Sequence, residues 1–181
     1  FYAYYPYDPS CNSVSEVPVN IPSKITYDEN APALSPLIVA SSTVTSIIAP
    51  VPMKFEAPAS CQLTLRIPET ACGVIKSLRM YPGNDSWKGR FAFTGTYNLL
   101  TGELHEDEAS LSKSITVDFG PEGYTMKPGY LKVSFLIGEA KYVTGGVKLE
   151  ITDINGVTVV KEIYNARHVF EAGKSYLYTM K

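Results

Sequence analysis

The stretch Cys61-Gln62-Leu63-Thr64-Leu65-Arg66-Ile67 alternates apolar and polar residues without a break. Successive side chains of a β-strand point to opposite faces, so this alternation is typical of a strand with one face buried and the other in water. The same pattern returns in residues 115–119, 131–137 and 147–151. No segment shows a 3.6-residue period over three turns. The sequence therefore predicts an all-β protein without any helix longer than three turns.

Turn residues separate these predicted strands. Residues 153–156 end in Asn-Gly, which readily adopts positive φ, so they are expected to join strands at 147–152 and 157–164. A strand is expected in 91–99, where Gly95 marks a bulge or a close approach of two backbones. The last strand is expected in 169–181, with an interruption at 172–174. A common core on one face of neighbouring strands is predicted for Leu131, Val133, Phe135, Val147, Leu149 and Ile151.

The prolines divide the chain into two parts. Ten of the 13 prolines lie in residues 1–68. Proline cannot donate to a central ladder, so strands in this part should be short or lie at sheet edges. The proline density falls near residues 68–73. We therefore predict a domain boundary here, between residues 1–71 and residues 72–181, and the second part has the right size for one antiparallel β-sandwich.

Composition and charge exclude several classes of partner. The 181 residues carry a net charge of −2 without any cluster of Lys and Arg, so nucleic acid is not an expected partner. No apolar run approaches the roughly 20 residues of a membrane-spanning helix, so no transmembrane segment is expected. The chain begins with Phe1 instead of Met, which we interpret as the start of a processed product.

The cysteines and other reactive side chains predict no catalytic or metal site. Three cysteines are too few for a disulfide framework, and an odd number cannot all form pairs. No two of them have the spacing of zinc ligands. Cys61 lies in an alternating strand and is expected to be a small buried apolar residue. His105 stands among acidic residues 103–108, which suit a metal ion or, as we expect, a solvated loop. No nucleophile motif accompanies His168. The carboxylates expected to face water are Asp118, Glu139 and Glu150.

The loop around the single tryptophan leaves two interpretations open. Asn84-Asp85-Ser86 is an N-glycosylation sequon beside Pro82-Gly83, which indicates an exposed loop. Trp87 follows directly. It could form a platform on which a sugar stacks, or it could pack onto the edge of its own sandwich.

Four segments carry a resemblance to a known family. They are the aromatic opening Phe1-Tyr2-Ala3-Tyr4-Tyr5-Pro6-Tyr7 and the stretches at residues 33–40, 51–56 and 170–176. In these segments the chain resembles the fimbrillin-like family of Bacteroidetes cell-surface pilus proteins, the type V pilins. It departs from that family at Glu56, where members often carry His. The aromatic segment normally lies inside the first domain, so the chain is interpreted as lacking the family's N-terminal strands and lipidation signal.

The resemblance implies a fold, a location and a way of assembling. It implies two transthyretin-like β-sandwich domains, export as a lipoprotein to the outer membrane and cell surface, and a strand in residues 51–56. It also implies trimming by a protease and insertion of one subunit's strand into another, which would satisfy unpaired backbone groups at a sheet edge. Other pilus subunits and a host or bacterial surface ligand are the expected partners. The candidate partner-strand contacts are Tyr176, Tyr178 and Met180.

Three classes of function follow from these observations. The leading hypothesis is a structural or adhesive subunit of a surface pilus, with no cofactor. The alternative is a carbohydrate-binding β-sandwich module of a surface glycan system, which would use Trp87 or exposed tyrosines. An enzyme comes third and is not expected. The opening aromatic segment either packs across the first domain or forms an edge strand without a role in assembly.

Overall fold

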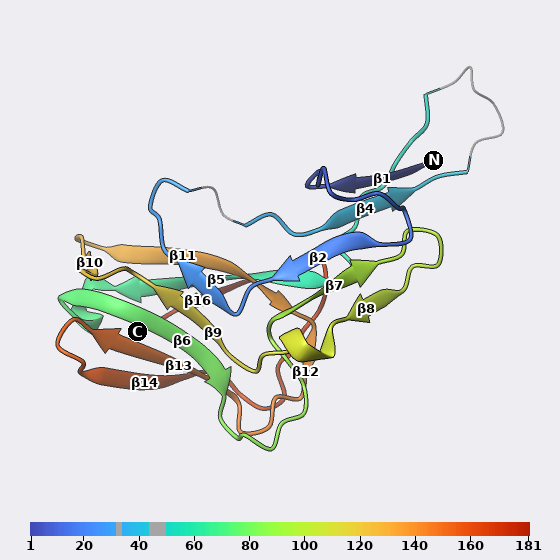
Figure 1. The fold of residues 1–181 in the computed structure, drawn as a ribbon. Coiled ribbons are helices and arrows are strands. Elements are labelled where there is room, and N and C mark those ends of the chain that lie inside the picture. Colours follow the sequence, from blue (N-terminus) through green and yellow to red (C-terminus); the bar gives the residue numbers. More distant parts are fainter. Residues whose placement is uncertain (32–33, 44–49) are drawn as a thin grey trace.

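A computed structural model describes residues 1–31, 34–43 and 50–181 of the chain and shows an architecture built from strands (Figure 1). Its helical segments among these residues are two short 3₁₀ turns, η1 (Glu69–Ala71) and η2 (Glu108–Ser110). The prediction of an all-β protein is confirmed. In the described residues, no helix is long and apolar enough to cross a membrane.

The larger sheet has the strand order β14-β13-β6-β9-β3, with β10 also paired to β6. Its strands are β3 (Lys24–Thr26), β6 (Val74–Pro82), β9 (Ile115–Asp118), β10 (Tyr124–Thr125), β13 (Val147–Asp153) and β14 (Thr158–Tyr164). All neighbours run antiparallel except β3 and β9, which run parallel. The sheet is therefore mixed, whereas the sequence predicted antiparallel pairing alone.

The second main sheet has the order β11-β5-β16, with β11 (Tyr130–Gly138), β5 (Ser60–Pro68) and β16 (Ser175–Thr179). The alternating stretch of the sequence forms β5, as predicted. Its apolar residues Cys61, Leu63, Leu65 and Ile67 are at most 1% exposed, because they all point to the same face. β11 pairs with β5 in antiparallel register, whereas β16 runs parallel to β5.

Three smaller sheets extend the two main ones. They are β2 (Val17–Ile21), β7 (Phe93–Tyr97) and β8 (Leu104–Glu106); β1 (Tyr2–Tyr5) and β4 (Ile38–Ser41); and β12 (Ala140–Lys141) and β15 (Val169–Phe170). A Cβ on Gly95 in β7 would lie 2.2 Å from the carbonyl oxygen of His105, which confirms the predicted close approach. The β1–β4 pair projects from one end of the molecule (Figure 1).

The hairpin between β13 and β14 is formed as predicted. One carboxylate oxygen of Asp153 accepts the backbone N–H groups of Asn155 and Val157, each at 2.8 Å. Gly156 has a φ of 81°, which glycine adopts without a steric penalty. The segment is therefore a tight turn that closes on its own backbone.

One core joins the faces of the main sheets. All six residues predicted to share a core belong to it and are at most 6% exposed. Their placement on neighbouring strands was wrong, however: β11 pairs with β5, while β13 lies between β6 and β14 in the other sheet. The two sets of residues meet across the sandwich. The prediction failed because alternation determines which face of a strand is buried but not which strands are its neighbours.

Strand pairing crosses the predicted division between residues 71 and 72. β5 pairs with β11 and β16, β3 with β9, and β2 with β7. Backbone hydrogen bonds therefore connect the two parts of the chain on either side of the change in proline density. Whether residues 1–71 and 72–181 fold independently stays a prediction.

The strand that the resemblance implied at residues 51–56 is not formed. Only Glu56 pairs, through an isolated antiparallel bridge to Val39 at the outer side of β4. Pro52 lacks a backbone N–H, which disfavours a longer ladder here. Of the segment at residues 33–40, Ala33 lies outside the described residues, and β4 begins at Ile38.

Candidate functional site: open strand edges and a surface pocket

β14 is the outermost strand of the larger sheet and exposes both of its faces. Residues 158–162 are all exposed, and the adjacent Val159 and Val160 are 37% and 47% exposed. The outer edge of β14 pairs with no other strand of the described chain. A long edge with unpaired N–H and C=O groups and apolar side chains is a template for pairing with another chain.

The predicted partner-strand residues lie in or directly after β16. Met180 is 5% exposed, and Tyr176 and Tyr178 are half-buried against the core, whereas Leu177 between them is 61% exposed. The Tyr176 hydroxyl donates to the carbonyl of Val169 at 3.0 Å. In the structure these side chains complete the chain's own sheet, and their contact with a partner stays a prediction.

β16 packs onto a cluster of aromatic rings. Tyr164 stacks on His168 with ring centroids 4.0 Å apart, and Phe170 meets the same imidazole edge-on at 4.5 Å. Burial, together with the neighbouring Tyr176 and Tyr178, raises the pKa of Tyr164 to about 12. Burial lowers the pKa of His168, whose Nε2 is enclosed without a hydrogen-bond partner in the described part of the chain.

This lowered pKa predicts an acid-sensitive fold. In the unfolded chain His168 should bind a proton near pH 6.5, while in the folded chain it binds one only at lower pH. The unfolded state then takes up more protons, so the free energy of unfolding should fall as the pH falls below about 6.5. Urea denaturation between about pH 7.5 and pH 5 would measure this fall.

Replacing His168 by phenylalanine keeps the aromatic contacts and should flatten that fall. His105→Phe is the matched control, because it makes the same substitution at an exposed position in β8. An equally steep profile in His168→Phe would show that other groups cause the acid sensitivity.

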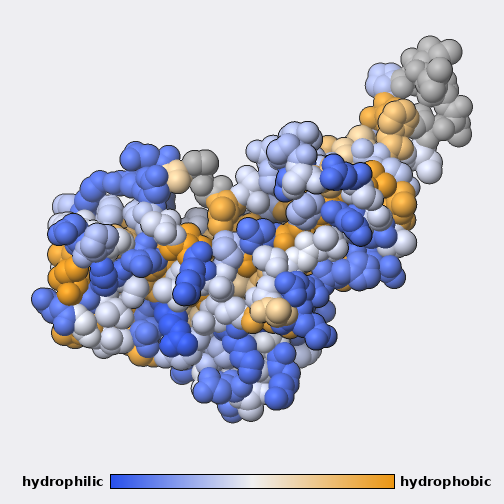
Figure 2. All heavy atoms as spheres, in the orientation of Figure 1, coloured by the Kyte–Doolittle hydropathy of each residue, from blue (hydrophilic) through white to orange (hydrophobic). Residues whose placement is uncertain are grey.

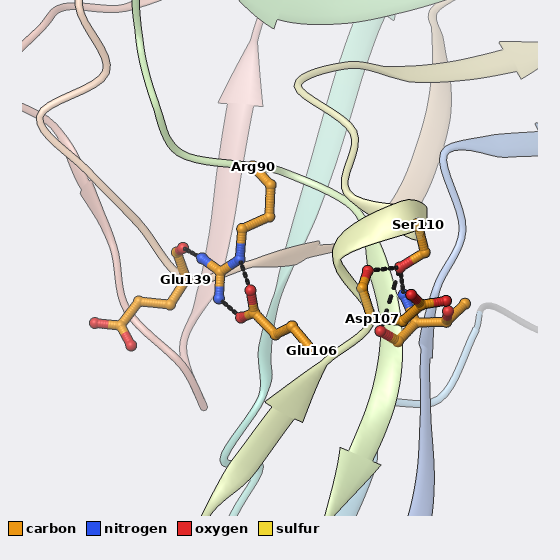
Figure 3. Close-up of polar contacts among 6 residues, drawn as sticks. Arg90, Glu106, Asp107, Ser110 and Glu139 are labelled. Carbon is orange, nitrogen blue, oxygen red and sulfur yellow. Dashed lines mark hydrogen bonds and ion pairs between the residues drawn. The ribbon is translucent and has the colours of Figure 1, made fainter.

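Figure 3 shows two sets of polar contacts that hold segments of the chain together. Arg90 donates to both carboxylate oxygens of Glu106, and through Nη1 to the carbonyl of Glu139 at 2.7 Å. Burial lowers the pKa of the guanidinium. Ser110 in η2 donates to the carbonyl of Asp107 at 2.7 Å. Arg90 thus ties β8 to the residue before β12.

The candidate catalytic residues of the sequence are scattered. His105 is exposed, and Asp118 is exposed and accepts the N–H of Gly120. Glu139 pairs with Lys141 at 2.7 Å, and Glu150 lies half-buried in β13. In the described chain, no group of three or more His, Cys, Asp or Glu side chains is arranged to hold a metal ion.

The cysteines are all free, and the prediction for Cys61 is confirmed. Cys61 is 1% exposed, and burial raises the pKa of its thiol to about 12. Its Sγ approaches the carbonyl oxygen of Ile137 at 3.7 Å. The side chain is therefore a packed apolar group, because a thiol with this pKa forms almost no thiolate near neutral pH.

Trp87 packs onto its own chain, so its interpretation as an exposed platform is wrong. The indole is 6% exposed and lies against Phe91 with ring centroids 4.8 Å apart. A Cβ on Gly89 would lie 2.3 Å from the indole, so only glycine allows this close contact. Trp87 lines a surface pocket of about 400 Å³ together with residues 88–90 and 139–142.

Two features of these sites escaped the sequence analysis. In Val157-Thr158-Val159-Val160 the valines occupy both parities, so an apolar residue faces each side of β14; this interruption of the alternation was the available signal. Tyr142 takes a left-handed φ of 50° and is 69% exposed. Tyrosine rarely adopts a left-handed backbone, so the sequence gives no reason to expect one at this position.

Comparison with known proteins gives one informative match. No family model and no curated protein matches the chain. The fold is similar to the crystal structure of a candidate cell adhesion protein from Bacteroides ovatus ATCC 8483, with a TM-score of 0.61 and 17% identity. The match covers 98% of this chain and 60% of that protein, so the chain spans about three fifths of its length. At this identity the likeness shows a shared all-β fold.

Proposed function

We propose that the chain is a structural or adhesive subunit of a bacterial cell-surface fibre and joins its neighbours by strand addition. The open edge of β14 carries the proposal. Its support includes the fold shared with a candidate cell adhesion protein and the resemblance to fimbrillin-like pilus proteins. The proposal assigns the chain to the cell surface, with other subunits as partners and without a catalytic step or a cofactor.

The edge of β14 offers an arriving strand backbone hydrogen bonds, and its side chains offer apolar contacts. Val157 and Val159 are separated from the buried Ile163 by an even number of residues, so they lie on the same side of the sheet as Ile163. Unlike Ile163, they are exposed to solvent. Val160 lies on the opposite side. A strand added at this edge would pair with the free backbone groups while its alternate residues cover these valines.

The arriving strand has to come from a segment that is free to move. β16 pairs with β5 along its whole length, and its donation would require withdrawal of Met180 from the core. We therefore place the acceptor at β14 and propose that the donor strand belongs to another subunit. The role of Tyr176, Tyr178 and Met180 as donor residues can be tested separately by truncation.

The aromatic opening lies at a second exposed position. β1 pairs with β4, and Phe1, Tyr2, Tyr5 and Tyr7 are 47% to 77% exposed. Figure 2 shows hydrophobic side chains over this projecting part of the molecule. Neither face of β1 is fully buried, which supports the interpretation of an edge strand over a strand packed across a domain.

A charge placed on β14 is expected to weaken assembly. Lys at position 160 would put an ammonium group where the arriving strand packs, so the dissociation constant of the oligomer should rise at least about tenfold. Sedimentation velocity over a range of concentrations would measure it. The melting temperature should stay the same, because Val160 is 47% exposed.

Val14→Lys is the matched control for this experiment. Val14 is 44% exposed and lies outside every strand of the described chain, so its replacement should leave assembly unchanged. A wild-type protein that stays monomeric at every concentration, alone and with co-expressed subunits, would refute strand addition at β14. Equal assembly of Val160→Lys and wild type would do the same.

A further inference from the structure

The conformation of Tyr142 sets it apart from the rest of the described chain. Among the non-glycine residues there, it alone has a positive φ, of 50°. The left-handed region costs an L-residue with a bulky side chain free energy that glycine does not lose. Gly145 and Gly146, shortly after it, occupy that region freely. The Tyr142 ring is 69% exposed and contributes little to the core. Packing of the core therefore does not explain why a tyrosine takes this strained conformation.

Tyr142 lines the pocket that also contains Trp87. Residues 87–90 and residues 139–142 together line this hollow of about 400 Å³. This volume lies within the range of small-ligand sites. The close contact between Gly89 and the indole fixes the first segment, and the hydrogen bond from Arg90 to the carbonyl of Glu139 ties the two segments together.

The polar groups of the pocket are arranged for a ligand with hydroxyl groups. Figure 3 shows the Glu139 carboxylate directed away from the Arg90 guanidinium, so Arg90 contacts Glu139 through the backbone oxygen and not through the carboxylate. The carboxylate pairs instead with the ammonium of Lys141 at 2.7 Å, and both side chains are more than a third exposed. A hydrogen-bond acceptor and a donor thus stand side by side at the rim.

We propose that this pocket binds a neutral hexose, as a terminal or branching unit of a glycan. Two adjacent sugar hydroxyls can donate to the Glu139 carboxylate and accept from the Lys141 ammonium at once. The apolar C–H face of the ring would stack on Tyr142, which offers an aromatic face at a small cost in conformational entropy. Tyr142 directly follows Lys141 of the ion pair in the chain, and both residues line the pocket. The site is separate from β14, so glycan binding and strand addition can fail independently.

The single tryptophan supplies the readout. Trp87 is the only tryptophan of the chain and lines the pocket, so titration with galactose, glucose, mannose and fucose can be followed by its fluorescence. We expect a saturable change with at least one of these sugars. Tyr142→Gly should weaken binding at least about tenfold while the melting temperature stays the same or rises, because glycine relieves the strain. Glu139→Gln should weaken binding without a change in stability.

Tyr7→Ala removes an equally exposed tyrosine and is the matched control, since Tyr7 is 77% exposed and lies on the β1 side of the molecule. Its affinity should equal that of the wild type. Absence of saturable binding for all four sugars would overturn the proposal, as would equal affinity in Tyr142→Gly and wild type. A Tyr142→Gly variant with lower stability would contradict the role assigned to the strain.

Discussion

Replacing Phe135 by alanine is expected to lower the free energy of unfolding by about 3 to 5 kcal/mol. Phe135 is 2% exposed in the middle of β11, directly opposite Leu63 of β5. Removal of the ring takes away its transfer free energy and leaves a cavity between the two main sheets, which the surrounding core fills only in part. Urea denaturation followed by circular dichroism would measure the loss.

Two variants distinguish a packing effect from a general effect of losing a ring. Phe55→Ala removes a phenylalanine that is 48% exposed, so its effect should stay within about 0.5 kcal/mol. Phe135→Leu keeps most of the buried volume and should cost less than Phe135→Ala. An unchanged denaturation midpoint for Phe135→Ala would contradict the packing of β11 described here.

Deletion of residues 176–181 is expected to abolish cooperative folding. The deletion removes the parallel partner of β5, the buried Met180 and two tyrosines of the aromatic cluster. Truncation of a buried methionine alone costs about 2 to 5 kcal/mol, and a domain has only about 5 to 15 kcal/mol to lose. Near-ultraviolet circular dichroism and thermal denaturation should show loss of fixed tertiary packing.

The deletion also separates the two roles considered for β16. Leu177→Ala is its mild counterpart, since Leu177 is 61% exposed and should leave stability almost unchanged. A truncated chain that stays folded but no longer assembles would assign β16 to a partner and contradict the structural role. A truncated chain that unfolds would show that the strand belongs to its own sheet.

Local alternation predicted the strands well, because the pleat alone decides which side chains lie together on a face. β5, β9 and β13 form where the alternation placed them, and β14 forms where the turn before it placed it. The turn at Asn155-Gly156 was equally local, since it depends on the backbone freedom of Gly156 and on the Asp153 carboxylate.

Pairing between distant strands could not be predicted in the same way. Nothing in the residues 175–179 shows that they lie parallel to β5, because pairing depends on which edges remain free once other strands have packed. The same reason separates β11 from β13. Of the candidate sites, the edge of β14 had a weak signal in its paired valines, whereas the pocket joins residues 87–90 to residues 139–142 and is visible only in three dimensions.

The parallel pairing of β5 with β16 also affects the order in which the chain can fold. Gln62 pairs with Ser175, so two segments far apart in the sequence must meet before this sheet is complete. Contacts between residues so far apart in sequence form only after the entropy cost of closing a long loop. β-Sandwiches dominated by such contacts fold in about milliseconds to seconds. On a ribosome, β5 emerges long before β16. Its edge then stays available for capture until β16 emerges, and chaperones that bind extended segments would protect it during that interval.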